Sequence, residues 1–165
     1  IVSSEQIYGS TATTLRHTLK RLGIECDFIP INDMDALRSA VRPNTKLVFC
    51  ESISNPGMEV SNIPEISKCA NSLGLPVVVD ATFATPTLNR PIEHGANIVV
   101  HSITKWIGGH GNSTGLLHGS RFQWKVCCAE DQAGLATPVW WSPCSSCQKM
   151  PNRTAPRWRQ SGVAA

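Results

Sequence analysis

A lysine with hydroxyl residues beside it is the part of the sequence that most directly suggests chemistry. Lys105 follows Ser102 and Thr104 within a few positions, and Gly108 and Gly109 come soon after it. Hydroxyls and backbone N–H groups bind phosphate well, and glycine lets a bound group approach the backbone closely. A lysine amine can form a Schiff base with a carbonyl carbon. One interpretation of the segment is a surface lysine with hydroxyl residues nearby, and the other is a site for a compound that carries both a phosphate and a carbonyl group.

Asp80 is the second candidate, because it follows three valines, Val77–Val79. A carboxylate at the end of so apolar a strand should be partly desolvated and needs a cationic partner. One interpretation is a structural ion pair or a helix cap, and the other is a partner for a protonated ring nitrogen. Pyridoxal phosphate (PLP) requires a carboxylate beside its pyridine nitrogen, a lysine for its aldehyde and donors for its phosphate. Asp80, Lys105 and the hydroxyls beside Lys105 supply this set.

These residues need a scaffold that brings distant parts of the chain together. Helix and strand patterns alternate as helix 13–22, strand 26–31, helix 33–41, strand 46–50, helix 63–73, strand 76–79 and strand 96–100. Asp33 is the predicted N-cap of the second helix, and Gly23 and Gly74 are the predicted ends of the first and third helices. The alternation predicts an α/β fold with a mostly parallel sheet flanked by helices. The continuous apolar run at 76–79 favours a strand buried on both faces.

Polar residues follow directly after three of the predicted strands, at 51–55, 80–82 and 101–105. Ligands bind beyond the carboxyl ends of the strands in an open parallel sheet. We therefore expect these three polar segments to meet at one edge of the sheet.

The composition sets limits on the class of protein. The 165 residues are 41% hydrophobic and 16% charged with a net charge of +3, which indicates one globular domain and gives no case for a nucleic-acid partner. No apolar run is long enough to cross a membrane. The chain starts at Ile1 without Met or a signal peptide, so we expect it to be a piece of a longer protein. The odd count of seven cysteines favours reduced thiols and a cytoplasmic location.

Residues 1–112 resemble the Cys/Met-metabolism family of PLP-dependent enzymes, and within it the O-acetylhomoserine sulfhydrylase branch. The resemblance is carried, in order, by 8–11 (YGST), 18–24 (TLKRLGI), 51–56 (ESISNP), 78–86 (VVDATFATP), 90–96 (RPIEHGA) and 101–111 (HSITKWIGGHG). It implies a fragment of the large PLP-binding domain of an aspartate-aminotransferase-like fold. It also implies a homo-oligomer that converts O-acetylhomoserine with sulfide in trans-sulfuration and methionine biosynthesis. Cystathionine γ-synthase and methionine or cystathionine γ-lyase are the alternatives within the family.

The resemblance further implies a role for each site residue. Lys105 is the expected Schiff-base lysine and proton shuttle, and Asp80 the expected partner of the pyridinium nitrogen. Ser102 and Thr104 are expected to bind the phosphate. Tyr8 is expected to stack on the ring and move protons. Asn55 is expected to bind the cofactor's phenolic oxygen or the substrate carboxylate, and Thr82 to pack by the ring.

The sequence departs from the family pattern in places. Ala81 stands where the family usually has Asn, and 115–120 contains too few apolar residues for the strand expected there. We interpret 113–125 as a degraded continuation of the domain. Residues 126–165, rich in Cys, Trp and Pro, are predicted to form a non-homologous or disordered tail, and a frame shift is our hypothesis for its origin.

Three other functions remain open. The chain could be a non-catalytic remnant that binds PLP poorly. It could be a metal-binding module built from Cys127, Cys128, Cys144 and Cys147 with His118, although a Cys-Cys dipeptide is poor zinc geometry and we predict no metal site. It could also be a nicotinamide-dependent dehydrogenase, although no G-x-G-x-x-G follows the first strand.

Overall fold

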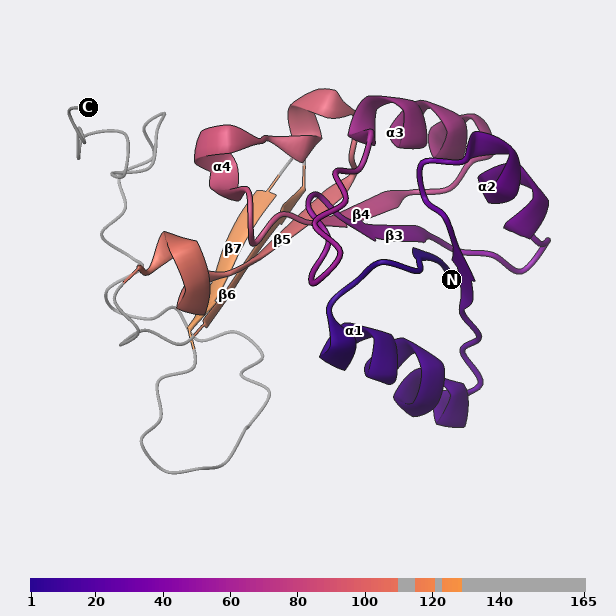
Figure 1. The fold of residues 1–165 in the computed structure, drawn as a ribbon, viewed down its shortest axis with the longest axis horizontal. Coiled ribbons are helices and arrows are strands. Elements are labelled where there is room, and N and C mark those ends of the chain that lie inside the picture. Colours follow the sequence, from indigo (N-terminus) through magenta and orange to yellow (C-terminus); the bar gives the residue numbers. More distant parts are fainter. Residues whose placement is uncertain (110–114, 121–122, 129–165) are drawn as a thin grey trace. The chain divides into compact units, whose positions relative to one another are not determined.

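The computed structural model describes residues 1–109, 115–120 and 123–128, the last of these as backbone only, and its main feature is one twisted sheet (Figure 1). In the described part the sheet has seven strands in the order β2-β1-β3-β4-β5-β6-β7. They are β1 Val2–Ser4, β2 Asp27–Ile29, β3 Val48–Glu51, β4 Val77–Asp80, β5 Ile98–Ser102, β6 Gly115–Ser120 and β7 Gln123–Cys128. Strands β1 to β5 pair in parallel, whereas β6 and β7 are antiparallel. The predicted mostly parallel sheet is therefore confirmed.

Helical segments connect the parallel strands. They are α1 Gly9–Thr13 with its continuations η1 Thr14–Thr18 and η2 Leu19–Leu22, α2 Met34–Ala40, α3 Ile63–Ser72, α4 Thr85–Leu88, η3 Pro91–His94 and η4 Ile103–Ile107. Asp33 caps α2 as predicted, because its Oδ1 accepts from the N–H groups of Asp35 and Ala36, each at 2.9 Å. Gly23 ends the first helix with a φ of +76°, a left-handed conformation that glycine adopts without steric cost.

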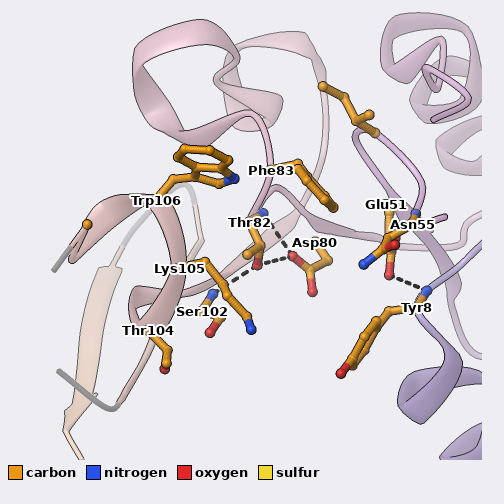
Figure 2. A pocket seen from close by; sticks show the side chains of 12 residues that line it. Tyr8, Glu51, Asn55, Asp80, Thr82, Phe83, Ser102, Thr104, Lys105 and Trp106 are labelled. Atoms are coloured by element: carbon orange, nitrogen blue, oxygen red, sulfur yellow. Dashed lines mark hydrogen bonds between the residues drawn. The ribbon is translucent and has the colours of Figure 1, made fainter. Parts of the chain in front are cut away.

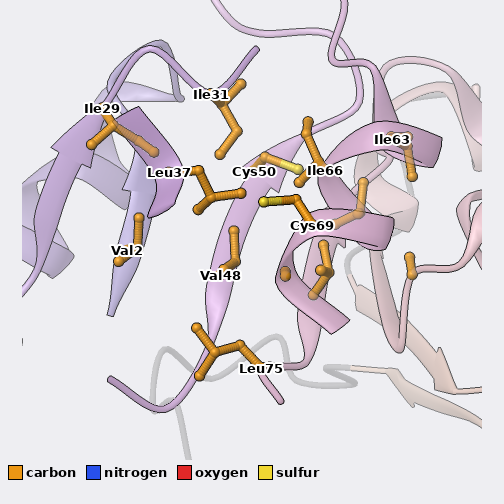
Figure 3. Close-up of a cluster of buried hydrophobic side chains, with 14 of the residues drawn as sticks. Val2, Ile29, Ile31, Leu37, Val48, Cys50, Ile63, Ile66, Cys69 and Leu75 are labelled. Carbon is orange, nitrogen blue, oxygen red and sulfur yellow. The ribbon is translucent and has the colours of Figure 1, made fainter. Parts of the chain in front are cut away.

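The core lies between the sheet and the helices α2 and α3 (Figure 3). Val48 and Val79 contribute from the strands, and Leu37 and Ile66 from the helices, and all four are fully buried. Val78, on the opposite face of β4, is only half-buried. In the described part of the chain, α2 and α3 cover one face of β4 and the other face is only half-buried, so the prediction of a strand buried on both faces is wrong for β4 there.

Three strands, β1, β6 and β7, were absent from the sequence prediction. Strand β1 is short and ends in two serines, so it has no long apolar run. Strand β6 forms in the segment expected to contain too few apolar residues, and its backbone pairs with β5 over five residues from Ile98 to Ser102 and with β7 on its other side. Antiparallel strands can leave one face exposed to water, so they need fewer apolar residues than strands covered on both faces.

Several predictions concern residues that the structure does not describe. The zinc alternative rests on Cys144 and Cys147, which lie outside the described residues, and on side chains of Cys127 and Cys128 that are likewise not described. The tail from 129 onward is also outside the described range. In the described part, Cys26, Cys50 and Cys69 are free thiols, and no group of potential metal ligands gathers. None of the helices described is long and apolar enough to cross a bilayer.

Candidate active site

A pocket of about 540 Å³ opens at the carboxyl ends of β3, β4 and β5. This volume lies in the usual range for a small-molecule or cofactor site. All seven predicted site residues line it: Tyr8, Asn55, Asp80, Thr82, Ser102, Thr104 and Lys105. Figure 2 shows Tyr8 and Asn55 on one side of the pocket, Ser102, Thr104 and Lys105 on the other, and Asp80 with Thr82 between them. The predicted meeting of three polar segments at one sheet edge is therefore confirmed.

Lys105 lies in the short helical segment η4, which follows β5 directly. Its own backbone is not helical, with φ −95° and ψ −127°, and this break turns the segment at the rim of the pocket. The N–H of Gly109 donates to the Lys105 carbonyl at 2.9 Å and closes the turn. Among the described residues, the Lys105 amine forms no ion pair or hydrogen bond, and Figure 2 shows it directed into the pocket.

Asp80, at the end of β4, is held in place by Thr82. Its Oδ1 accepts from the Thr82 N–H at 2.9 Å and from the Thr82 hydroxyl at 2.5 Å. The same hydroxyl oxygen accepts from the Ser102 N–H at 2.9 Å. Thr82 thus links the ends of β4 and β5, and within the described residues the second Asp80 oxygen, Oδ2, is left without a hydrogen-bond partner. The expectation for Thr82 was ring packing only, and its bridging hydroxyl was not foreseen.

Tyr8 and Asn55 are joined by a residue to which the sequence analysis gave no role. Glu51, the last residue of β3, accepts from the Tyr8 N–H through Oε1 at 2.8 Å and from the Asn55 N–H through Oε2 at 3.0 Å. Its side chain is buried, with 5% of the residue's surface exposed. Burial raises the pKa of this carboxyl, the two N–H donors oppose that rise, and the neighbouring carboxylate of Asp80 adds to it. Glu51 follows an apolar strand just as Asp80 does, so the same rule could have found it.

His101 is a second buried polar residue without a predicted role. Only 1% of it is exposed, and its Nδ1 lies 3.0 Å from the Ala81 carbonyl oxygen. Burial lowers the pKa of the imidazole, against the opposing effects of the Ala81 carbonyl and of Asp80. A neutral ring that donates from Nδ1 to Ala81 explains this contact and fixes the backbone next to Asp80.

The fold and the pocket together form an α/β domain with a ligand-sized cavity, and the Lys105 amine beyond the end of β5 has no partner among the described residues. The sequence matches the family model "Cys/Met metabolism PLP-dependent enzyme" over residues 1–137. The chain therefore belongs to the Cys/Met-metabolism family of PLP-dependent enzymes, as its resemblance implied.

Individual relatives agree with this assignment. The chain is 40% identical over 126 residues to the O-acetyl-L-homoserine sulfhydrylase of Leptospira meyeri, a match covering 75% of this chain and 28% of that protein. It is 40% identical over 116 residues to the L-methionine gamma-lyase of Fusobacterium nucleatum, covering 68% of this chain and 29% of that protein. The chain thus spans less than a third of the length of these relatives.

Solved structures also share the fold. An O-acetylhomoserine (thiol)-lyase structure from Campylobacter jejuni matches with a TM-score of 0.69 and 35% identity, covering 78% of this chain and 30% of that one. That structure carries N'-pyridoxyl-lysine-5'-monophosphate. The predicted fold, that of the PLP-dependent enzymes related to aspartate aminotransferase, is confirmed.

The pocket's own donors and acceptors fit PLP. A pyridinium nitrogen needs an acceptor, and Asp80 Oδ2 is available; a phosphate needs donors, and the Ser102 and Thr104 hydroxyls line the pocket. An aldehyde needs an amine, and Lys105 offers one. No side chain of the pocket would have to give up an existing hydrogen bond to supply these contacts in the described structure.

Proposed function

We propose that this chain carries a PLP site in which Lys105 is the residue that attaches the cofactor. The observation that supports the proposal most directly is the set of unpartnered groups around one pocket. In the described part of the chain, the Lys105 amine, Asp80 Oδ2 and the Tyr8 hydroxyl form no internal bonds, although each lines the pocket. Groups left unpaired at a sheet edge are available to a ligand, and their types match PLP.

Each residue then has a definite task. Asp80 accepts a hydrogen bond from the ring nitrogen and keeps that nitrogen protonated, while Thr82 keeps the carboxylate in position. Ser102 and Thr104 donate to the phosphate. Tyr8 covers the ring and exchanges protons near the substrate's leaving group, and Asn55 donates its amide to the cofactor or to the substrate carboxylate. When bound, the cofactor withdraws electrons from the substrate's α-carbon.

We propose sulfhydrylation of O-acetylhomoserine as the reaction of the whole protein. In this reaction the bond between the γ-carbon and the acetate oxygen breaks and a carbon–sulfur bond forms, so that O-acetylhomoserine and sulfide give homocysteine and acetate. In this proposal the Lys105 amine takes a proton from the substrate's carbon skeleton and returns one later. The relative from Leptospira meyeri supports this choice, and the relative from Fusobacterium nucleatum supports a γ-lyase or γ-synthase as the second candidate.

Further parts of the proposal concern the chain as a whole. Residues 1–112 would form the PLP-binding part and 113–125 its degraded continuation. Of the predicted tail 126–165, residues 126–128 belong to strand β7 of the sheet, so a segment outside the domain would begin only after β7. Self-association into a homo-oligomer belongs to the proposal as well. A cytoplasmic location is part of the proposal too, and the odd count of seven cysteines supports it.

PLP titration followed by a turnover assay tests the proposal. We expect purified chain to develop the absorbance of lysine-bound PLP, and Lys105→Ala to lose it. Homocysteine should then form from O-acetylhomoserine only when sulfide is present. Methionine or cystathionine breakdown instead would favour the γ-lyase, and cofactor absorbance without turnover would favour a non-catalytic remnant. Absence of the Lys105-dependent absorbance would contradict the proposal.

A further inference from the structure

Glu51 connects two chain segments that lie far apart in sequence. Tyr8 is in the segment between β1 and α1, and Asn55 is in the segment between β3 and α3. The two Glu51 oxygens are divided between them, Oε1 to the Tyr8 N–H at 2.8 Å and Oε2 to the Asn55 N–H at 3.0 Å. One carboxylate therefore fixes the backbone positions of two pocket residues at once.

The burial of this carboxylate needs an explanation beyond stability. Within the described residues Glu51 forms no ion pair, and the charged neighbour that acts on it is another carboxylate, Asp80, which it faces across the β3–β4 pairing. An unpaired buried carboxylate is costly, and charge-assisted hydrogen bonds from backbone N–H groups offset part of that cost. An apolar residue in its place would avoid the cost but would leave the two N–H groups without an acceptor.

The same two segments touch at a second point. A Cβ added to Gly57 would lie 2.5 Å from Gln6 Oε1, so the Gln6 side chain reaches across to the segment that holds Asn55. Ser54 reinforces one of them, because its hydroxyl accepts from the Glu59 N–H at 2.9 Å. The segments thus behave as one wall, with Tyr8 and Asn55 on its pocket side (Figure 2).

We infer that Glu51 is a positioning residue whose carboxylate joins the Tyr8 and Asn55 segments and sets the pocket wall that faces Lys105. The inference deepens the proposed function and rests on it, because the wall matters only to a pocket that holds a ligand. It assigns Glu51 no contact with the cofactor. Its effect on a bound cofactor is transmitted through Tyr8 and Asn55.

Glu51→Gln separates this role from simple packing. The two side chains have nearly the same shape, but glutamine offers one acceptor oxygen and one NH2 donor. The substituted amide can therefore accept from only one of the two N–H groups and presents a donor to the other. Glu65→Gln, an exposed site on α3, makes the same chemical change outside the pocket and is the matched control.

Tyr8 allows this role to be measured without any cofactor, because it is the only tyrosine in the chain. A sample labelled with 15N-tyrosine gives a single backbone amide signal in an NMR spectrum. We expect this signal to follow the protonation of Glu51, with a midpoint above the ordinary value for a glutamic acid, since burial raises that pKa. Asp80 and Lys105 also line the pocket, so Asp80→Asn is tested alongside and should keep the titration step. Glu51→Gln should abolish the step, and Glu65→Gln should retain it.

Cofactor binding gives the second readout. We expect Glu51→Gln to weaken PLP binding roughly tenfold, equivalent to about 1.4 kcal/mol, while Glu65→Gln binds as the parent chain does. A Tyr8 signal that does not titrate in the parent chain, or that titrates unchanged in Glu51→Gln, overturns the inference even if a variant folds poorly. A parent chain that shows the Tyr8 titration but binds no PLP overturns the proposed function and leaves the Glu51 linkage supported.

Discussion

Replacing Thr82 with valine is predicted to weaken both the fold and the cofactor site. The hydroxyl of Thr82 donates to Asp80 Oδ1 at 2.5 Å and accepts from the Ser102 N–H at 2.9 Å. Valine keeps the shape of the side chain but can do neither. Loss of a hydrogen bond to a charged group costs about 1.5–3 kcal/mol, and an N–H left without an acceptor costs about 1–3 kcal/mol.

Both contacts are only partly buried, so the lower ends of these ranges apply. We expect the free energy of unfolding to fall by about 2–3 kcal/mol, which corresponds to a drop in Tm of roughly 4–12 °C for a domain of this size. PLP should also bind more weakly, because Asp80 and Ser102 lose their common support. Urea unfolding, thermal unfolding and PLP titration measure these effects.

Two control variants make the Thr82 test specific. Thr82→Ser keeps the hydroxyl and loses one methyl group, so a cost of about 1 kcal/mol and near-normal PLP affinity are expected. Thr87→Val changes an exposed threonine and should stay within about 0.5 kcal/mol of the parent chain. A Thr82→Val variant that matches the parent chain in both stability and PLP affinity would refute the bridging role.

Two further predictions concern the fold. Because burial lowers the pKa of His101, the folded chain binds fewer protons at this residue than the unfolded chain does. The free energy of unfolding should therefore fall as the pH drops from about the ordinary value of 6.5 through the lowered pKa. Urea unfolding at several pH values should show this loss in the parent chain and in the exposed-site control His94→Gln, but not in His101→Gln. Ile66 is fully buried under the sheet, so Ile66→Ala should lower the free energy of unfolding by about 2–5 kcal/mol. Leu88 is 79% exposed, so Leu88→Ala should change it little. Equal effects in the two variants would contradict the assigned core.

The residues at the ends of long apolar strands were the most predictable. Asp80 is the last residue of β4, and Lys105 lies shortly after the end of β5. The valine runs of β4 and β5 identify both as strands of a parallel sheet, and the rule for ligand sites in such sheets then brings the two residues together. The same reasoning applies to Asn55 after β3. Family resemblance assigned roles to these residues, and the physical pattern alone placed them at one edge.

Contacts that depend on strand register could not be predicted in this way. The bridge from Thr82 to Ser102 exists because β4 and β5 pair with Asp80 opposite Val100, a register that no local pattern specifies. Strand β1 escaped prediction because two of its three residues are serines, and the Glu51 contact with Tyr8 depends on where β1 ends. The half-buried face of β4 was also unpredictable, because an apolar run does not show on which face of the sheet the helices pack.

The most direct test of the central claim is chemical trapping of the cofactor on Lys105. The chain is incubated with PLP at a low molar excess, reduced with borohydride, digested and analysed by mass spectrometry. The account predicts a phosphopyridoxyl group on Lys105, with far less on surface lysines such as Lys20, and loss of the label from that peptide in Lys105→Arg. Labelling of Lys105 no greater than that of Lys20 would contradict the assignment of this pocket as a PLP site.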